Sequence, residues 1–296
     1  MLASKLIEYG FNVKMMHTPH IPIKNLKNPS FAVLSTLKGM FSKTNYDIVH
    51  AFNLPSAFAM RFAKGKKKVL SIHGIYSEQV KALHSSTISS MANTTEAKIL
   101  KWPNALTTDS KATQIEYKKK LGLDFEYLPS PLDISKFEKI PDVEKVANQV
   151  AYVGRDSYEK GIDILKEAES KIKGNVIYCT DILWEDAMTI LKSSNVVVVP
   201  SRIESLPTTV KEAFYLKVPV VATNVGGIPE LITHEKTGIL VPPNDPQKIV
   251  EAVNTLLEKK ECAKNLANAA YEFVIKNMTW DVVLPKYIKF YEKLLQ

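Results

Sequence analysis

Two glutamates eight residues apart, Glu204 and Glu212, lie in the stretch ESLPTTVKE. Pro207 suits the first turn of a helix, where its missing N–H costs nothing, and Ser205 just before it can cap that helix. The stretch therefore predicts a helix that starts between the glutamates. Glu204 then lies on the entering loop, and Glu212 lies roughly one and a half turns inside the helix. Either both carboxylates face one pocket at the helix N-terminus, or Glu212 is an exposed residue paired with a neighbouring lysine.

Two cations occupy the loop that follows the first strand predicted in the second half of the chain. Arg155 offers a planar guanidinium and Lys160 a point charge, both beside a helix N-terminus. Such a pair forms an anion site that suits a diphosphate, although solvated loop residues are the alternative. The helix that contains Glu212 adds free backbone N–H groups through its dipole. These N–H groups belong to the residues around Leu206, Thr208 and Thr209.

A diphosphate in this place assigns a task to each carboxylate. Glu204 can accept hydrogen bonds from sugar hydroxyls near the phosphate, and Glu212 can accept them from a ribose diol one layer deeper. In the first half, His73 ends the apolar strand that leads into Ser71-Ile72-His73-Gly74. A histidine in that position is either a hydrogen-bonded structural residue or a group that faces a ligand.

The elements that must position these residues follow an α/β pattern in both halves. Apolar strands without alternation are typical of parallel sheets buried on both faces. In the first half we predict helices over 1–9 and 110–121 and strands over 11–16, 48–51, 69–73, 105–108 and 126–128. In the second half we predict strands over 150–153, 175–179, 196–199, 218–222 and 238–241. Helices are predicted there over 161–171, 184–193, 208–216, 246–257 and 280–295.

A polar stretch over 135–149 separates the halves, and it predicts two doubly wound domains. The first domain spans 1–140, and the helix at 280–296 is expected to pack back on it. The second domain spans 147–279. Because ligands of open parallel sheets bind beyond the carboxyl ends of the strands, Arg155, Lys160 and Glu204 fall where a ligand is expected.

Length and composition agree with two ordinary domains. The chain has 296 residues, of which 45% are hydrophobic and 24% are charged. Its longest apolar runs are far shorter than the roughly 20 residues that cross a bilayer, and its start lacks the pattern of a signal peptide. The two cysteines are too few for a disulfide framework. These features predict a cytoplasmic protein.

The net charge of +8 is unevenly distributed. Residues 1–140 hold 20 Lys and Arg against 10 Asp and Glu, whereas residues 141–296 hold 19 against 21. This asymmetry suggests that the first half meets something anionic, such as a membrane surface, a phosphorylated lipid or nucleic acid. An ordinary solvated basic surface is the alternative. Nucleic acid is disfavoured, because the aromatic residues that interleave such surfaces are lacking.

Three stretches together resemble the retaining, nucleotide-sugar-dependent glycosyltransferases of family 4, which have the GT-B fold. They read ALTTDSKATQIEYKKKLG, YVGRDSYEKGIDILKEA and PSRIESLPTTVKEAFYLKVPVVATNVGGIPELITHEKTGILVPPNDPQKIVEAV. The last stretch carries the family's signature of two glutamates with seven residues between them. The resemblance extends over nearly the whole chain. It implies two Rossmann-like domains that face each other across a cleft.

The resemblance also implies roles for single residues. Arg155 and Lys160 would hold the donor diphosphate, Glu204 would touch the transferred sugar, and Glu212 would bind the ribose. The nucleobase would lie near Ile182, and no metal would be required. His73 resembles the family's strand-end histidine, which faces the donor sugar. Retention is usually explained in this family by front-face attack, in which the leaving phosphate takes the acceptor proton, so the two cations rank above the histidine.

The resemblance is incomplete at the start of the chain. The family begins with a strand and a glycine-rich loop, whereas Met1 already lies in the helix that follows them. We therefore expect an incomplete N-terminal domain, because the start is truncated, because a separate chain supplies the element, or because the domain has adapted. The turn Pro129–Asp133 also departs from the family's pattern of proline, asparagine, glycine, valine and aspartate.

These observations favour a hexosyltransferase of cell-surface polysaccharide biosynthesis. It would move a sugar such as mannose or glucose from a nucleotide-diphosphate donor, GDP-mannose or a UDP-hexose, to a lipid-linked, polysaccharide or other glycan acceptor. The basic first half would bind the acceptor and bring the protein to the inner face of the membrane. The rival hypothesis is a nucleotide-sugar-binding subunit or remnant without turnover.

Overall fold

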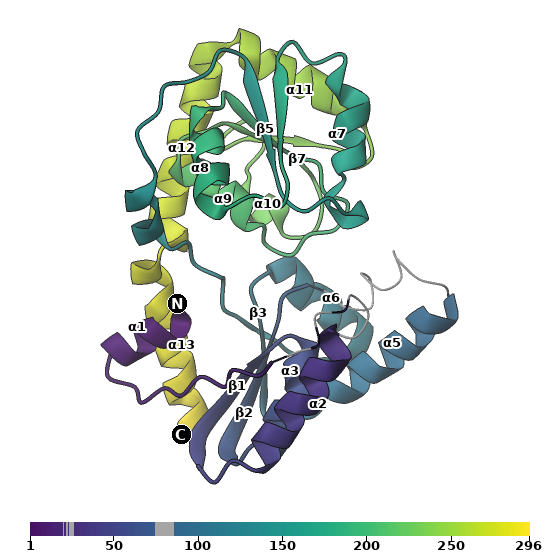
Figure 1. The fold of residues 1–296 in the computed structure, drawn as a ribbon, viewed down its shortest axis with the longest axis vertical. Coiled ribbons are helices and arrows are strands. Elements are labelled where there is room, and N and C mark those ends of the chain that lie inside the picture. The colour runs from purple at the N-terminus through teal and green to yellow at the C-terminus, as the bar shows by residue number, and fades with distance from the viewer. Residues whose placement is uncertain (20, 22, 24–26, 75–85) are drawn as a thin grey trace. The chain divides into compact units, whose positions relative to one another are not determined.

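The computed structural model describes residues 1–19, 21, 23, 27–74 and 86–296, which form two compact units (Figure 1). Unit 1 comprises Met1–Pro129 and Val283–Gln296, and unit 2 comprises Ser130–Val282. The division lies earlier than the predicted boundary at residue 140. The reason is that Leu132, Phe137 and Ile140 are buried in the core of unit 2. A 3₁₀ helix, η1 (Ile134–Lys139), therefore replaces the first part of the predicted polar linker.

Unit 2 is built on a five-stranded parallel sheet with the strand order β6-β5-β7-β8-β9. The strands are β5 (Gln149–Val153), β6 (Asn175–Cys179), β7 (Val196–Val199), β8 (Val220–Thr223) and β9 (Ile239–Val241). Four consecutive valines form β7, and their side chains alternate between two core clusters. Because both faces of the sheet are covered, an uninterrupted apolar strand is stable here.

Helices cover both faces of this sheet (Figure 1). One face carries α8 (Trp184–Ser193), α9 (Thr208–Tyr215) and α12 (Lys260–Met278), and the other carries α7 (Ile162–Glu169) and α11 (Pro246–Glu258). Two short elements, η2 (Tyr158–Lys160) and α10 (Ile228–Leu231), lie in the loops after β5 and β8. The predicted α/β arrangement of the second half is confirmed, with several element boundaries matching to the residue.

Unit 1 contains a four-stranded parallel sheet with the order β1-β2-β3-β4. The strands are β1 (Tyr46–Phe52), β2 (Gly65–Ile72), β3 (Ala105–Thr108) and β4 (Glu126–Tyr127). The helices are α1 (Leu2–Glu8), α2 (Lys27–Met40), α3 (Leu54–Phe62), α5 (Ser86–Ile99) and α6 (Lys111–Leu121), and α13 (Trp280–Leu295) joins them from the end of the chain. Together the two units have the two-domain parallel α/β plan that the sequence predicts.

The strand predicted at residues 11–16 is wrong, because these residues form no regular structure. In the described part of the chain, no strand of the unit 1 sheet pairs with this segment. Without a neighbouring strand, the N–H and C=O groups of an extended segment have no ladder to join. Phe11 and Val13 instead pack on the core cluster formed by α1, β2 and α13.

The last helix, α13, packs on the sheet of unit 1. Tyr287 and Tyr291 are buried in the same cluster as Val69 of β2. The Tyr291 hydroxyl lies 2.7 Å from Nδ1 of His50, whose Nε2 lies 2.6 Å from the Ser71 hydroxyl. Burial lowers the pKa of His50 to about 3, so this histidine is neutral at physiological pH. None of the helices in the described part of the chain is both long and apolar enough to span a bilayer.

Candidate functional site

The strand order of unit 2 has a switch point between β5 and β7. The chain leaves β5 toward β6 on one side and leaves β7 toward β8 on the other. Open parallel sheets bind ligands beyond the carboxyl ends of their strands at such a point, so the loops after β5 and β7 lie where a ligand is expected. Arg155 and Lys160 belong to the first loop and Glu204 to the second, so the topology brings predicted residues from both loops to one place.

Lys160 and Glu204 form an ion pair across this switch point, although 44 residues separate them. The Ser201 hydroxyl donates a second hydrogen bond to the same Glu204 oxygen at 3.1 Å. Only 9% of the Glu204 side chain and 27% of the Lys160 side chain are exposed. Each member of a partly buried ion pair of this kind can exchange its partner for a charged or polar group of a ligand.

Two glycines allow the loops to approach this closely. Gly161 has a φ of +65°, and a Cβ there would lie 2.0 Å from the carbonyl oxygen of Pro200. Gly226 has a φ of +52°, and a Cβ there would lie 1.9 Å from the carbonyl oxygen of Glu204. Both positions need a residue without a side chain, because L-residues rarely adopt this backbone conformation and the space is already filled. The loops after β5, β7 and β8 are thus packed backbone against backbone.

Arg155 differs from Lys160 in its surroundings. Its side chain is 73% exposed, and one guanidinium nitrogen lies 3.0 Å from the carboxylate of Glu159. The backbone of the loop is fixed by a hydrogen bond, because the Tyr152 hydroxyl donates to the Arg155 carbonyl oxygen at 2.7 Å. Burial raises the pKa of Tyr152, and the carboxylates of Asp156, Glu204 and Glu159 add to that increase. Lys160 is therefore the more embedded of the two predicted cations.

Arg202 supports both loops and was not predicted. Its guanidinium makes two 2.7 Å hydrogen bonds to the Asp163 carboxylate, a third to the Tyr158 carbonyl oxygen at 2.9 Å and a fourth to Asn244 at 2.7 Å. It also stacks over the Tyr158 ring at 4.3 Å. A planar fork with this many partners fixes loop geometry. The one signal in the sequence was an arginine three residues after the end of a buried strand.

Helix α9 begins at Thr208, as in the predicted range 208–216, but its N-cap is not the predicted one. Thr208 is its first residue and Pro207 occupies the N-cap, so the prediction of Ser205 as the cap is wrong. Leu206 is buried, and the Thr209 hydroxyl donates to the Val153 carbonyl oxygen at 3.3 Å. This bond ties the helix start to the end of β5. The first N–H groups of a helix have no partner within it, so those of Thr208 and Thr209 remain available to an anion.

Glu212 lies inside α9 and is only 8% exposed. The Trp184 indole nitrogen donates a hydrogen bond to its carboxylate at 2.8 Å. Burial raises the pKa of Glu212, and the hydrogen bond from Trp184 partly opposes that increase. The alternative of an exposed glutamate paired with a lysine is therefore wrong. Trp184 was predicted only as the first residue of a helix, and nothing in its spacing pointed to Glu212.

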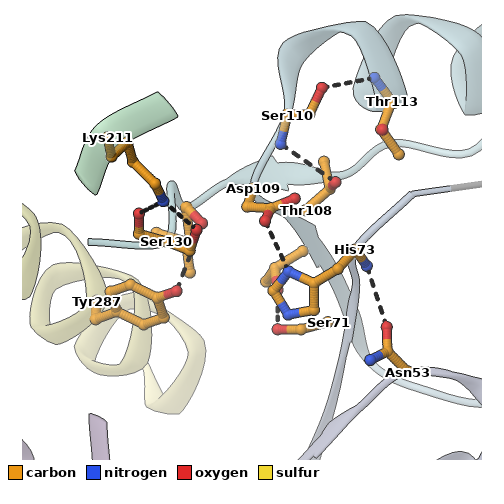
Figure 2. A network of polar contacts seen from close by, with 12 residues as sticks. Asn53, Ser71, His73, Thr108, Asp109, Ser110, Thr113, Ser130, Lys211 and Tyr287 are labelled. Carbon is orange, nitrogen blue, oxygen red and sulfur yellow. Dashed lines mark hydrogen bonds and ion pairs between the residues drawn. The ribbon is translucent and has the colours of Figure 1, made fainter. Parts of the chain in front are cut away.

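Lys211, beside Glu212, is fully buried and serves a different purpose. Its ammonium donates to the carbonyl oxygen and the hydroxyl of Ser130 at 2.7 and 2.9 Å (Figure 2). Ser130 belongs to the turn that departs from the family's pattern, and the lysine holds it where unit 2 begins. A fully buried ammonium needs such partners, because an unpaired charge in the interior is costly.

Ile182 lies in the loop between β6 and α8, beyond the carboxyl end of β6. It is 44% exposed, and its neighbour Leu183 is 71% exposed. Asp181 just before them has a φ of +53°, which turns the chain sharply there. An exposed apolar residue at this edge of the sheet offers a surface on which a flat ring can pack.

His73 lies in unit 1, directly after β2 (Figure 2). Its Nδ1 is 2.9 Å from the carboxylate of Asp109, whose side chain is only 6% exposed. Its backbone N–H donates to the side-chain oxygen of Asn53 at 3.3 Å, and its ring stacks on that of Phe52 with centroids 6.1 Å apart. These contacts fix the orientation of the ring and engage its Nδ1, so Nε2 is the nitrogen that can meet a ligand.

No group of three or more His, Cys, Asp or Glu side chains in the described ranges is gathered closely enough to hold a metal ion. The polar groups of the two sites are instead engaged with each other in pairs, as Lys160 is with Glu204 and His73 with Asp109.

Two family models match the chain, one in each half. The model described as Glycosyltransferase Family 4 matches residues 4–136, and the model described as Glycosyl transferases group 1 matches residues 169–273. The first covers most of unit 1, and the second lies within unit 2 and includes Glu204 and Glu212.

Curated relatives carry the same description. An uncharacterised glycosyltransferase of Methanocaldococcus jannaschii is 25% identical over 86% of this chain and 77% of its own length. A Bacillus subtilis glycosyltransferase named for teichuronic acid biosynthesis is 25% identical over 82% of this chain and 69% of its own length.

Solved structures with GT-B architecture share the fold. Sucrose-phosphate synthase from Thermosynechococcus elongatus has a TM-score of 0.80 at 20% identity, over 99% of this chain and 91% of that one. The Anabaena protein HepE, solved in complex with UDP-glucose, has a TM-score of 0.70 at 17% identity, over 98% of this chain and 88% of that one.

Proposed function

Because the chain belongs to the GT-B glycosyltransferases, we propose that it transfers a hexose from a nucleotide-diphosphate sugar to a glycan acceptor with retention of configuration. The observation that carries the proposal is the Lys160–Glu204 ion pair at the switch point of unit 2. HepE, which shares the fold, is a protein solved with UDP-glucose, and this supports a uridine nucleotide as one donor to test.

In the proposed reaction, the donor diphosphate exchanges partners with the ion pair. Lys160 turns from Glu204 to the diphosphate, Arg155 closes over it from the surface, and the N–H groups of Thr208 and Thr209 face its oxygens. Glu204 is then free to accept hydrogen bonds from hydroxyls of the transferred sugar. Glu204 keeps hydrogen-bond donors in both states, because the Ser201 hydroxyl remains and the sugar hydroxyls take the place of Lys160.

The buried carboxylate of Glu212 is assigned to the ribose diol. Trp184 fixes one of its oxygens at 2.8 Å and leaves the remaining lone pairs for two hydroxyl donors. Ile182 is assigned to one face of the nucleobase, beyond the end of β6. In this arrangement the nucleotide lies along the carboxyl edge of the unit 2 sheet, with its base toward β6 and its phosphates between β5 and β7.

Transfer breaks the bond between the sugar C1 and the diphosphate oxygen and forms a bond between C1 and the acceptor oxygen on the same face. The acceptor proton passes to the departing diphosphate oxygen. Negative charge develops on that diphosphate, where Lys160, Arg155 and the helix amides are already placed, so electrostatic stabilisation supplies most of the catalysis. The proposal includes no metal, because these groups provide the positive charge.

His73 is assigned a lesser part, at the sugar. Asp109 holds Nδ1, so Nε2 is the nitrogen directed to a sugar hydroxyl. The acceptor is proposed to be lipid-linked or part of a polysaccharide, since unit 1 carries the excess of basic residues. The name of the Bacillus subtilis relative supports a cell-surface polysaccharide as the product. Action at the cytoplasmic face of the membrane is part of the same proposal.

Calorimetric titration with UDP-glucose and with GDP-mannose tests this function. The parent protein should bind at least one donor, and the double variant Arg155→Ala, Lys160→Ala should lose at least about a hundredfold in affinity. Lys248→Ala is the matched control, because Lys248 is a surface lysine of unit 2 whose ammonium pairs with Glu251. Equal affinity of the double variant and the parent would overturn the proposal.

A transfer assay with the bound donor then separates the enzyme from its rival. Product whose anomeric configuration matches the donor supports retaining transfer. Donor binding without hydrolysis or transfer would instead favour a nucleotide-sugar-binding subunit.

A further inference from the structure

Helix α2 buries its small residues and exposes its large apolar ones, whereas a surface helix usually buries its apolar side. It packs on α3 through its small residues, because Ser35 and Gly39 are buried on one side of the helix. A Cβ at Gly39 would lie only 2.9 Å from the carbonyl oxygen of Ala59 in α3. Close approach through small residues leaves the large apolar residues of α2 on the opposite side.

Those large residues form an exposed surface, which we call the α2 apolar face. Its exposed fractions are 60% for Val33, 39% for Leu34, 45% for Leu37, 50% for Met40 and 79% for Phe41. At 3.6 residues per turn the five side chains fall within an arc of about 120°. Phe41 belongs to the same arc because its N–H still bonds to the Leu37 carbonyl oxygen at 3.1 Å. Solvent-facing surface helices normally carry polar residues over this arc.

The charge around this face has one sign. Between Glu8 and Asp47 the sequence contains five lysines and no aspartate or glutamate. Two of these lysines are exposed beside the α2 apolar face, Lys38 within the helix and Lys43 just after Phe41. Lys38 also donates to the His17 carbonyl oxygen at 2.5 Å, which holds it at the border of the face.

We propose that the α2 apolar face docks on an anionic lipid bilayer, with its side chains in the acyl boundary and its lysines among the headgroups. A contiguous apolar arc with basic flanks has the chemistry of an interfacial helix. A second copy of this chain is disfavoured as the occupant, because two acid-free lysine-rich segments would repel each other. The surface goes beyond the reaction proposed above, and only its use in presenting a lipid-linked acceptor rests on that reaction.

Vesicle co-sedimentation without any sugar donor tests the surface. The parent protein should sediment with phosphatidylglycerol vesicles and much less with phosphatidylcholine vesicles. The double variant Leu37→Gln, Phe41→Gln keeps the net charge and removes two large side chains, so its binding should fall about tenfold or more. Val146→Gln is the control, since Val146 is 49% exposed in unit 2 and should bind as the parent does.

A second variant reports directly whether the α2 apolar face inserts into the bilayer. Phe41→Trp places an indole on the face, and its emission should shift to shorter wavelength on addition of phosphatidylglycerol vesicles. No shift, or full binding by the Leu37→Gln, Phe41→Gln variant, would overturn the proposal. So would a parent that is a dimer in solution and becomes monomeric in that variant, because the face would then be an interface between copies.

The result of the vesicle experiment does not depend on the proposed transferase function. Donor affinity of the Leu37→Gln, Phe41→Gln variant should equal that of the parent, because these residues lie in unit 1 and the donor site is proposed in unit 2. A failure of vesicle binding leaves the donor titration unaffected, and a failure of donor binding leaves the vesicle result standing.

Discussion

The two units hold their candidate residues in different ways. In unit 2, the loops after β5, β7 and β8 meet backbone against backbone at Gly161 and Gly226. In unit 1, His73 follows β2, and the ring is held by side chains, with Asp109 on Nδ1 and Phe52 against its face. Unit 2 therefore fixes the loops that carry its groups by close backbone packing, whereas unit 1 fixes its histidine by side-chain contacts.

This difference leads to different sensitivities. A site whose loops are held by backbone packing survives the loss of one supporting side chain but depends strongly on the groups that meet the ligand. A site built by individual contacts loses its geometry when one partner is changed.

Removing the embedded cation of unit 2 should have the largest effect. Lys160→Ala is expected to lower the transfer rate about 10³-fold, or about 4 kcal/mol of transition-state stabilisation, because charge develops on the diphosphate. Steady-state kinetics with the donor found by calorimetry measures the loss. Lys248→Ala should retain the parent rate. A smaller loss for Lys160→Ala than for His73→Ala would reverse the order of the two units.

Acidification should lower the stability of unit 1 more than that of unit 2. Burial holds the pKa of His50 at about 3, whereas its ordinary value is 6.5, so the unfolded chain binds a proton at a pH where the folded chain does not. Stability then falls as the pH falls below about 6.5, by up to about 1.4 kcal/mol per pH unit, which gives about 3 kcal/mol at pH 4.5. The only histidine of unit 2 is the exposed His234.

Hydrogen exchange of each unit at pH 7 and pH 4.5 measures this contribution. His50→Gln keeps hydrogen-bonding groups toward Tyr291 and Ser71 without titrating near neutral pH, so it should flatten the pH dependence of unit 1. Equal loss of protection in both units on acidification would contradict this account.

Changing the partner of His73 should reproduce most of the effect of removing the histidine. We expect His73→Ala to lower the rate about thirtyfold and Asp109→Asn about tenfold, because the ring loses its fixed tautomer. The effect should appear in kcat more than in KM, which a merely structural role for Asp109 would not produce. An Asp109→Asn variant with parental kcat would show that the ring needs no such support.

The smallest effect is expected at the indole that supports Glu212. Trp184→Phe removes a hydrogen bond that opposes the raised pKa of this buried carboxyl group. More Glu212 is then protonated at low pH, so nucleotide affinity should fall about threefold at pH 8 and further at pH 6. Calorimetry at both pH values measures the change. A loss that is larger at pH 8 would contradict the assignment of Glu212 to the ribose.

The same contrast explains what the sequence predicts well. In unit 2 the strands 175–179 and 196–199 and the helix 184–193 have the predicted bounds, because each apolar run is buried by its immediate neighbours in the sheet. The placement of Arg155, Lys160 and Glu204 beyond strand ends follows from the same pattern. The Lys160–Glu204 pair itself joins residues 44 apart, and no local spacing reports such a contact.

Unit 1 was predicted less well for a physical reason. The segment 11–16 has strand-like residues, but a strand also needs a partner, which a local pattern does not reveal. Helix α2 was not predicted at all, because its buried side is Ser35 and Gly39 rather than an apolar stripe. Burial of these small residues made the helix hard to predict. It also leaves exposed the large apolar residues that form the proposed docking surface.

A crystal structure of the protein with a bound sugar nucleotide tests the central claim most directly. We predict that the diphosphate lies beyond β5 and β7, with Lys160 Nζ and the N–H of Thr208 within hydrogen-bonding distance and Glu204 on the sugar. The account would be contradicted by a nucleotide bound elsewhere while Lys160 stays on Glu204.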